Sequence, residues 1–222
     1  MIITQWANYF DILQDKFGSP YFTDAEKSLL FNRALVQYVA EFLPVEEPGP
    51  LNVEMDRDSI ASLSPLIYEL PALNMTSAGI ILKSTIQGSL TAQITGGVLW
   101  RELALKATLG TDVNPPNYTR HNDWAQFLNN SFKSPTDGNP KYYETALDFR
   151  FLPINTITNY VFTVLKYPVS VVIDSVAPSN NVSSDMPDFT HDKIIAIALE
   201  LAGISSRDEA LITLKNTRSP EV

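Results

Sequence analysis

Two stretches of helical periodicity open the chain. The large apolar side chains of residues 4–17 recur at spacings of four, three and four residues, which places them on one face of a helix; they are Trp6, Phe10, Leu13 and Phe17. Residues 23–42 keep the same period, with apolar positions at Phe31, Ala34, Leu35, Tyr38, Val39 and Phe42. The pattern predicts two consecutive amphipathic helices, each with a core-facing stripe.

The residues around these stretches predict where each helix begins and ends. Gly18 can adopt the left-handed conformation that closes a helix, and Pro20 cannot continue one. Thr23 and Glu26 stand three residues apart in the order of a capping box, in which each side chain accepts a hydrogen bond from the backbone amide of the other residue. The second helix is therefore predicted to start at Thr23 and to end before Pro44.

Between residues 60 and 174 the pattern becomes mostly extended, with Gly, Pro and Asn between short apolar runs. Residues 79–84 and 90–95 are β-rich and flank residues 87–88, which predicts a hairpin at that point. Alternation predicts one strand over residues 142–151, ended by Pro153. A further strand is predicted over residues 160–167, ended by Pro168, before the alternation resumes at Val169.

Residues 98–109 fit two interpretations. A strand would align five residues on one face: Leu99, Leu103, Leu105, Ala107 and Leu109. A helix would group four residues ahead of Gly110: Trp100, Leu103, Ala104 and Ala107. Periodicity does not decide between them, and we favour the strand.

The C-terminal part returns to helical patterns. Phe189 precedes Thr190, and Ile194 follows five residues after Phe189, which is the arrangement of a hydrophobic staple around an N-cap. Gly203 is expected to end this helix, and residues 206–209 form a second capping box that opens a short helix.

These patterns predict an α+β fold with a single domain over residues 1–222. Helices at both ends, residues 1–44 and 188–216, are expected to pack as a helical bundle. A central antiparallel β region, residues 60–175, is expected to be inserted between them as a small sandwich or a barrel-like sheet. An acidic, Pro-rich connector covers residues 44–60, either as a solvated loop or as an arm across a neighbouring subunit, and residues 175–188 are expected to be a mobile acidic loop unless a partner covers them.

The composition of the chain argues against several classes of protein. The 16 Lys and Arg face 25 Asp and Glu, for a net charge of -9, so the chain lacks the electrostatic footprint of a nucleic-acid-binding protein. Absence of cysteine excludes disulfides, thiolate metal sites and cysteine nucleophiles. No apolar run long enough to span a membrane and no signal-peptide pattern is present, so we expect a soluble protein with no membrane partner.

The sequence contains few candidate catalytic or metal-binding residues. Neither His121, in a polar loop, nor His191, in the first turn of a helix, has a second metal ligand at a suitable spacing, and no nucleophile elbow or phosphate-binding loop is present. We therefore expect no enzyme, no cofactor and no metal. Trp124, Phe127 and Phe132 could form a sugar platform or a peptide-docking patch, although such aromatics more often pin a loop to its own core.

Several short motifs carry a resemblance to a known family. They are FDILQDKFGSPYFTDAEK (10–27), NRA (32–34), NNSFKSP (129–135), PKYY (140–143), LKYP (165–168) and HD (191–192). In these motifs and in the order of its elements the chain resembles virion structural proteins of crAss-like gut phages, in particular head-to-tail connector or ring proteins of short-tailed phages.

The resemblance implies a structural protein of the virion, made in the bacterial host cytoplasm. Its implied partners are copies of itself in a ring of about twelve, the portal protein, and adjacent tail or ring proteins, with DNA passing through the channel without specific binding. Exposed aromatics are candidate subunit contacts: Tyr21, Phe22, Trp124, Phe127 and Phe132. Acids of the connector are candidate channel-facing residues, because like charge repels DNA: Glu46, Glu47, Glu54, Asp56 and Asp58. Alternatives are a tail hub or stopper protein, or a tail-associated carbohydrate-binding module or hydrolase.

Overall fold

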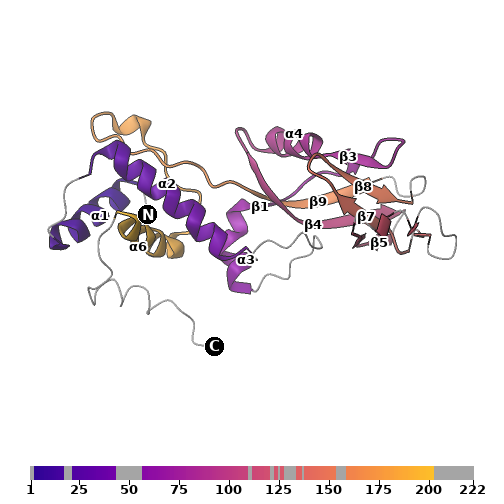
Figure 1. Cartoon of the computed structure of the whole chain (residues 1–222). Coiled ribbons are helices and arrows are strands. Elements are labelled where there is room, and N and C mark those ends of the chain that lie inside the picture. Colours follow the sequence, from indigo (N-terminus) through magenta and orange to yellow (C-terminus); the bar gives the residue numbers. More distant parts are fainter. Residues whose placement is uncertain are drawn as a thin grey trace. The chain divides into compact units, whose positions relative to one another are not determined.

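The computed structural model has mixed α and β structure and divides into two compact units (Figure 1). It describes residues 3–17, 22–43, 57–109, 112–120, 123–124, 126–127, 134–136, 138–153 and 159–202. The helical unit comprises residues 1–44, 55–66 and 168–222, and the β unit comprises residues 45–54 and 67–167. The predicted α+β class is confirmed at this level.

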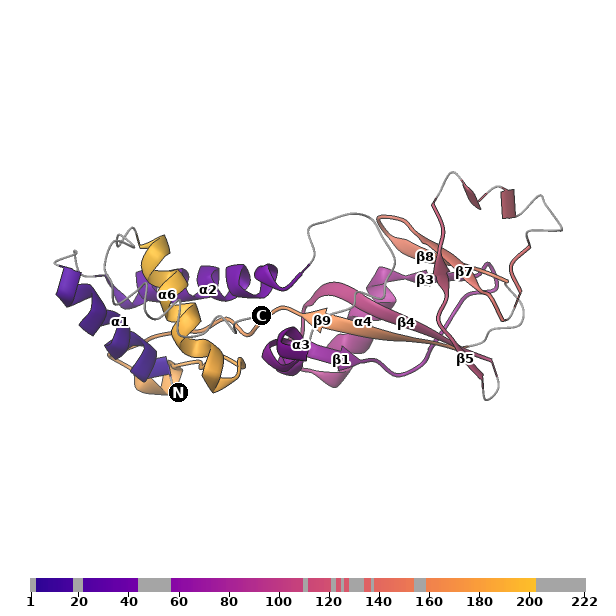
Figure 2. The same ribbon diagram turned by 90° about the horizontal axis from the view of Figure 1, so that it is seen from below.

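The helical unit is built from segments at both ends of the chain. Its described helices are α1 (Ile3–Phe17), α2 (Asp24–Glu41), α3 (Arg57–Leu63) and α6 (His191–Leu201), with 3-10 turns η1 (Ser64–Leu66), η2 (Pro178–Asn180) and η3 (Asp188–Thr190). Figure 2 shows α1, α2 and α6 gathered together, and α6 packs on both other helices. The connector predicted over residues 44–60 is thus helical from Arg57 onward.

The capping box and the apolar stripes predicted for the first two helices are present in the structure. Thr23 accepts a hydrogen bond from the Glu26 amide at 3.3 Å, and the Glu26 carboxylate accepts one from the Thr23 amide at 2.8 Å, so the capping box is confirmed. All the predicted apolar positions with described side chains are buried or half-buried: Trp6, Phe10, Leu13, Phe31, Ala34, Leu35, Tyr38, Val39 and Phe42. The Phe17 side chain, Gly18 and Pro20 lie outside the described part of the chain, although α1 does end at Phe17.

Aromatic rings and two ion pairs join the three helices. Phe31 of α2 lies edge-on to Trp6 and Phe10 of α1, with ring centroids 5.4 and 5.5 Å apart. Lys27 donates to Asp11 at 2.7 Å between α2 and α1, and Lys193 of α6 lies 2.8 Å from a Glu41 oxygen. Residues 194–199 of α6 are all buried, as expected for a helix that is covered on every side.

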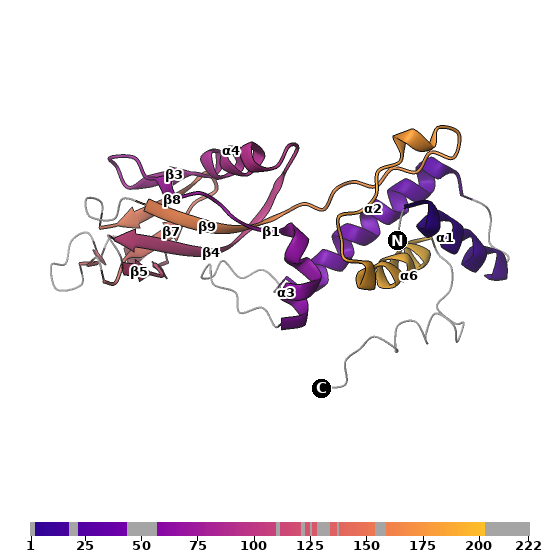
Figure 3. The ribbon, with the colours of Figure 1, turned by 180° about the vertical axis from the view of Figure 1, so that it is seen from behind.

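An extended segment, residues 168–187, runs beside α2, and we call it the strap (Figures 1 and 3). Asn32 accepts a hydrogen bond from the Val171 amide at 2.8 Å and donates one to the Val171 carbonyl at 3.0 Å. The Ser28 hydroxyl accepts from the Ile173 amide at 3.0 Å. The Asp24 carboxylate accepts from the Ser175 amide at 2.8 Å. Three side chains of one helix face thus bind alternate backbone amides of the strap.

The spacing of these contacts follows from helix and strand geometry. Four residues of a helix rise about 6 Å, and two residues of an extended strand advance about 6.6 Å. Positions i, i+4 and i+8 of α2 can therefore each meet every second residue of an antiparallel extended chain. The arrangement satisfies the backbone of a buried segment that has no sheet neighbour on that side, and Val171 and Ile173 are buried there.

Beyond these contacts the strap folds back on itself. Val172 and Val182 exchange backbone hydrogen bonds of 3.1 and 3.0 Å. Asp174 accepts from the amides of Val176 and Ala177 and from the Asn180 side chain, at 3.0, 2.7 and 2.9 Å. The strap therefore has partners within the chain itself, which the expectation of a mobile loop at residues 175–188 did not foresee.

The start of α6 differs from the predicted hydrophobic staple. Thr190 has helical backbone angles and makes no capping bond; its hydroxyl donates to the Pro187 carbonyl at 2.7 Å. Phe189 is 53% exposed, so it does not close over the helix start. The 3-10 turn η3 leads directly into α6 and replaces a side-chain cap. The predicted stop at Gly203 and the capping box at residues 206–209 lie outside the described residues.

The β unit contains two sheets. Its elements are β1 (Ile67–Glu69), β2 (Leu73–Asn74), β3 (Ile80–Leu82), α4 (Lys83–Gln93), β4 (Leu99–Leu109), β5 (Asp112–Asn114), β6 (Asn117–Tyr118), β7 (Lys141–Glu144), β8 (Asp148–Leu152) and β9 (Asn159–Lys166). One sheet has the order β1-β9-β4-β5, with β2 also paired to β9, and the other has the order β3-β8-β7-β6. All pairs are antiparallel except β6 with β7, which are parallel, so the predicted all-antiparallel region is wrong at this pair.

Both sheets contribute to one apolar core. Phe149 of β8 and Phe162 of β9 lie 5.3 Å apart by ring centroids, and Phe151 of β8 lies 4.1 Å from Tyr160 of β9. Ile86 and Leu90, which stand one turn apart on α4, are fully buried in the same cluster. The strand interpretation of residues 98–109 is confirmed, and its predicted face is buried at Leu103, Leu105 and Ala107.

Two strand predictions were wrong. The hairpin around residues 87–88 is instead α4, because the spacing of Ile86 and Leu90 suits a helix face that covers the core. The single strand over residues 142–151 is instead a hairpin of β7 and β8. Its turn is held by the Thr145 hydroxyl, which accepts from the amides of Leu147 and Asp148 at 3.2 and 3.0 Å, and Leu147 is 76% exposed there.

We predict that Asn32→Ala destabilises the helical unit. The substitution removes both hydrogen bonds to Val171 and leaves the amide and carbonyl of a buried residue unpaired. The expected cost is about 1–3 kcal/mol in the free energy of unfolding, measured by urea denaturation. The neighbouring, exposed Arg33 provides the control, because Arg33→Ala should change stability by no more than about 0.5 kcal/mol. Equal effects of the two substitutions would contradict the role given to Asn32.

Candidate functional site

Two of the aromatic residues predicted as subunit contacts, Phe22 and Trp124, have ring partners inside the chain. Phe22 is half-buried, and its ring centroid lies 6.0 Å from that of Phe10. Residues 123–124 and 126–127 are helical, and the Trp124 ring lies edge-on to Tyr143 of β7 at 4.5 Å. Tyr21 and Phe132 lie outside the described residues. These contacts favour the interpretation that the aromatic side chains pin their own segments to the core. The role of these aromatic residues as subunit contacts stays a prediction.

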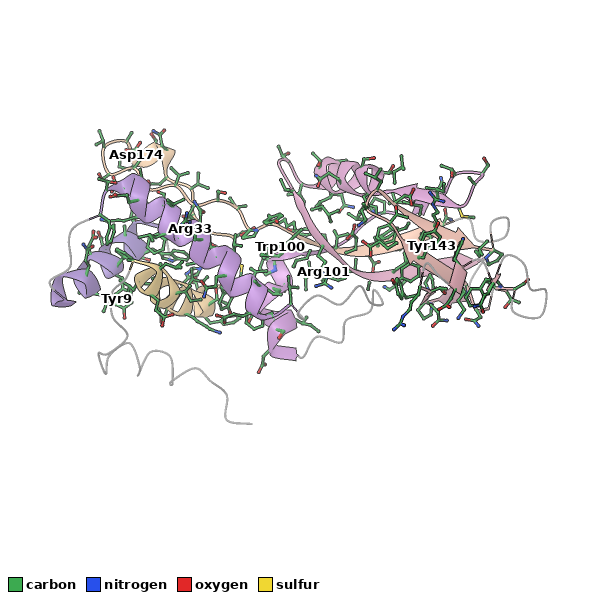
Figure 4. The ribbon with its side chains drawn as sticks, in the orientation of Figure 1. Tyr9, Arg33, Trp100, Arg101, Tyr143 and Asp174 are labelled. Carbon is green, nitrogen blue, oxygen red and sulfur yellow. The ribbon has the colours of Figure 1, made fainter. Side chains whose placement is uncertain are left out.

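Tyr143 anchors a polar group on the hairpin of β7 and β8 (Figure 4). The Arg150 guanidinium lies 5.7 Å from the Tyr143 ring centroid, and its Nε lies 3.3 Å from an Asp148 oxygen. The Thr145 hydroxyl donates to the same Asp148 carboxylate at 2.7 Å. With Trp124 also packed against the Tyr143 ring, which is buried, this group stabilises the hairpin.

Four of the five acids predicted to face a channel, Glu46, Glu47, Glu54 and Asp56, lie outside the described residues. Asp58 is exposed in the first turn of α3, where a negative charge is favourable to a helix.

Charge is distributed unevenly between the parts of the chain. Residues 67–167 carry eight Lys and Arg against seven Asp and Glu, a net of +1. The rest of the chain therefore carries eight Lys and Arg against eighteen Asp and Glu, a net charge of -10. The whole negative excess belongs to the helical unit and to residues 45–54, a division that net charge alone does not show.

Several acids of the helical unit are held ionised by hydrogen bonds. The bond from Ser175 lowers the pKa of Asp24, the backbone amide of Thr23 lowers the pKa of Glu26, and the backbone amide of Ala177 lowers the pKa of Asp174. These three acids gather where the N-terminal end of α2 meets the strap, and Figure 4 shows Asp174 at that end. The negative charge of this corner therefore persists below the usual pKa range of carboxylates.

Glu102 is a buried acid that sequence reasoning missed. It lies on β4 next to a shift in the pairing register with β9, and the irregularity places Glu102 and Leu103 both in buried positions. Among the described residues its Oε1 has no hydrogen-bond partner. Burial raises the pKa of Glu102, which nearby Lys83 and Glu144 shift in opposite directions. The sequence did contain a signal for this buried acid, because Glu102 is a charged residue within the apolar strand pattern of residues 98–109.

Two acids of the β7–β8 hairpin, Glu144 and Asp148, are already paired. Lys83 at the start of α4 forms an ion pair with Glu144 of β7, and Asp148 is bound by Thr145 and Arg150. A glycosidase needs a protonated acid opposite a second, available carboxylate. Because Glu144 and Asp148 are both paired, these contacts help to hold β7 and β8 in place.

His191 is buried at the first position of α6. Its Nε2 donates to the Met186 carbonyl at 2.9 Å, since a carbonyl can only accept. Its ring lies 4.7 Å from Trp6, and its Nδ1 lies 3.4 Å from an oxygen of the exposed Asp188. Burial lowers the pKa of His191, so the residue is a neutral part of the helical core. The predicted position of His191 in the first turn of a helix is confirmed. His121 lies outside the described residues.

A stacked aromatic pair marks the end of the β4–β9 pairing. The rings of Trp100 and Tyr167 are parallel to within 8°, with centroids 4.5 Å apart, and Figure 4 places Trp100 beside Arg101. Tyr167 is 42% exposed and the neighbouring Val98 is 53% exposed. Trp, Tyr and Arg are the residue types most enriched in binding hot spots. We therefore regard these residues as a candidate contact surface, which no local sequence signal could reveal.

Within the described parts of the chain, no group of three or more His, Asp or Glu is arranged to hold a metal ion. None of the described helices is both long enough and apolar enough to span a bilayer.

We predict that Glu102→Gln stabilises the protein increasingly as the pH rises from 5 to 8. Because burial raises the folded pKa above its ordinary value of 4.5, Glu102 costs stability as it ionises in the folded state at higher pH. The glutamine removes that cost, and urea denaturation at both ends of the range measures it. Glu144→Gln is the control, because it breaks the ion pair with Lys83 and should destabilise. A pH-independent effect of Glu102→Gln would contradict the prediction.

We predict that His191 makes the helical unit less stable as the pH falls. The unfolded histidine takes up a proton below a pKa of about 6.5, whereas the buried ring resists it, so the unfolded state gains protons first. Thermal unfolding between pH 7.5 and 5 should show a smaller loss of stability in His191→Gln than in the original protein. His121→Gln should leave the slope in place, and an equal flattening by both substitutions would contradict this assignment.

Comparison with known proteins gives no family. A scan against protein-family models finds no model that matches the chain. A search of the curated proteins also finds no significant match. The functional argument therefore rests on the residues and contacts described above.

Proposed function

We propose that the chain is a virion structural protein that forms an oligomeric ring in the head-to-tail connector of a short-tailed phage. About twelve copies would form a collar next to the portal, join the capsid portal to the tail and line the DNA channel. The protein would be made in the bacterial host cytoplasm and would then reside in the virion. In this role it would have no enzymatic activity and would need no cofactor.

The uneven distribution of charge is the observation that carries this proposal. Residues 67–167 are close to neutral, whereas the rest of the chain has a net charge of -10. In a ring, an acidic surface that faces the channel repels the DNA backbone and prevents it from adhering during passage. A nearly neutral surface is suited to contact between subunits, where like charges would cost energy. This division favours acids of the helical unit and of residues 45–54 at the channel.

The proposal includes a finer description of the fold. The N- and C-terminal helices would act as a helical bundle, with the β region inserted between them as a small sandwich. Phe31 with Trp6 and Phe10 supports the bundle, and the Phe149–Phe162 pair supports the sandwich. The Trp100–Tyr167 pair, of which Tyr167 is exposed and Trp100 half-buried, would offer a contact surface for a neighbouring subunit.

A tail hub or stopper protein in the same stack is the second candidate, because it needs the same acidic channel. A carbohydrate-binding module or hydrolase at Trp124 is less favoured, since that ring packs on Tyr143 and the nearby Asp148 is already paired.

Cryo-electron microscopy of purified virions tests the proposed function. We expect density for the chain as a closed ring between the portal and the tail, with the acidic end of α2 or residues 45–58 toward the channel. Mass spectrometry of the same particles should detect the chain at a copy number similar to that of the portal protein. Absence of the chain from purified virions would refute the proposal, and density lower in the tail would favour the hub or stopper.

A further inference from the structure

The carboxyl group of Glu102 lies inside the β unit with one oxygen unpaired. The residue is on β4 and is 8% exposed, and its Oε1 has no hydrogen-bond partner among the residues that the structure describes. An ionised carboxylate in such a place costs free energy unless a cation is within reach. The elements packed against β4 therefore decide how this group can ionise.

Hydrogen bonds fix how α4 lies on β4. The Gln87 side chain accepts from the Leu99 amide at 2.7 Å and donates to the Gly97 carbonyl at 2.9 Å. The hydroxyl of Thr91, one turn later in the helix, lies 3.3 Å from the same Gly97 carbonyl oxygen. Later residues of the helix thus meet earlier residues of the strand, so α4 and β4 run in opposite directions.

This arrangement brings a lysine level with Glu102. Lys83 precedes Gln87 by one turn of α4, which is about 6 Å along the helix. In the pairing with β9, Glu102 stands only two strand positions beyond Leu99, about 6.6 Å, because the irregular register absorbs the third residue. The two steps are nearly equal and lead in the same direction. In agreement with this placement, the charge of Lys83 acts on the Glu102 carboxyl group.

Lys83 is also bound to the hairpin of β7 and β8. Its ammonium group forms an ion pair with Glu144 and lies 5.3 Å from the centroid of the Phe149 ring. Its backbone amide donates to the Leu147 carbonyl, in the turn of the hairpin, at 2.9 Å. The charge of Glu144 acts on Glu102 as well. One cation therefore lies within the influence of two carboxyl groups, one paired and half-buried, the other buried with an unpaired oxygen.

Other charged side chains on the strands around Glu102 are engaged with one another or with an aromatic ring: Asp148 with Arg150, Glu69 with Lys106, and Lys166 with Tyr68. Arg101, next to Glu102 on β4, acts on the carboxyl group less than Lys83 does. Lys83 is therefore the cation best placed to respond when Glu102 ionises.

We propose that Lys83 is a counter-ion shared by Glu102 and Glu144, and that the Lys83–Glu144 pair is a proton-controlled latch between α4 and the β7–β8 hairpin. While Glu102 is protonated, the latch is closed. When Glu102 releases its proton to solvent, the new negative charge draws the Lys83 ammonium group inward and weakens its pair with Glu144. The turn that carries the exposed Leu147 is then held less firmly. This device belongs to the β unit alone and does not depend on the ring proposed above.

Burial sets the pH at which the latch works. It is the largest influence on Glu102 and raises the pKa of the carboxyl group above its ordinary value of 4.5, while the charge of Lys83 opposes the rise. Glu102 therefore loses its proton at a higher pH than a solvated glutamate does. The latch is closed below that pH and open above it.

Carbon-detected NMR of the purified, full-length chain tests the latch, because the carboxyl carbon of each glutamate reports its own charge and surroundings. Between pH 4 and pH 8 we expect the Glu102 signal to titrate with a midpoint above 4.5 and the Glu144 signal to show a step at the same midpoint. The Lys83 amide, which donates to Leu147, should lose hydrogen-exchange protection several-fold across that step, after correction for the intrinsic effect of pH.

Three variants separate the latch from unrelated titrations. Lys83→Met removes the cation, so the Glu102 midpoint should rise by about one pH unit and the step at Glu144 should disappear. Glu102→Gln should abolish the step at Glu144 and the loss of protection at the Lys83 amide. Lys106→Met is the matched control, because Lys106 lies on the same strand and pairs with Glu69, and it should leave the Glu102 midpoint in place.

Two outcomes would overturn the proposal. One is a Glu102 midpoint that is unchanged in Lys83→Met or is moved equally by Lys106→Met. The other is a step at Glu144 that persists in Glu102→Gln, and this second readout does not depend on the folding of Lys83→Met. Both are measured on the isolated chain, so they leave the proposed place of the protein in the virion untouched.

Discussion

The hydrogen bonds between α2 and the strap are the contact on which the helical unit depends. A buried extended chain needs partners for its amides, and no strand lies beside Val171 and Ile173 on the α2 side. Asn32, Ser28 and Asp24 supply them because helix and strand advance by nearly equal steps. This contact places α6 against α1 and α2 and closes the core.

In the β unit the corresponding constraint is the long pairing of β4 with β9. It brings the inner faces of the two sheets together through rings such as Phe162 and Tyr160. The irregular register of this pairing buries the carboxylate of Glu102. One oxygen of that carboxylate has no hydrogen-bond partner among the described residues. At its end, the same pairing stacks Trp100 on Tyr167 and so creates an exposed aromatic surface.

Negative charge is concentrated outside residues 67–167, a division that supports the proposed assembly. The acids at the end of α2 are fixed in hydrogen bonds and stay ionised, so they form a permanent feature of the surface. Residues 67–167 of the β unit are close to neutral and expose single apolar residues such as Leu147. These fixed charges and exposed apolar residues are surface features that support the proposed assembly.

The sequence by itself determined the local structure: the capping box of Thr23, the two amphipathic stripes and the strand that ends before Pro168. These features depend on residues within one or two turns of each other. The tertiary structure alone decided that residues 83–93 are helical, that Asn32 binds Val171 and that His191 is buried. Each of these outcomes depends on partners far away in the chain, and a periodic pattern carries no information about them.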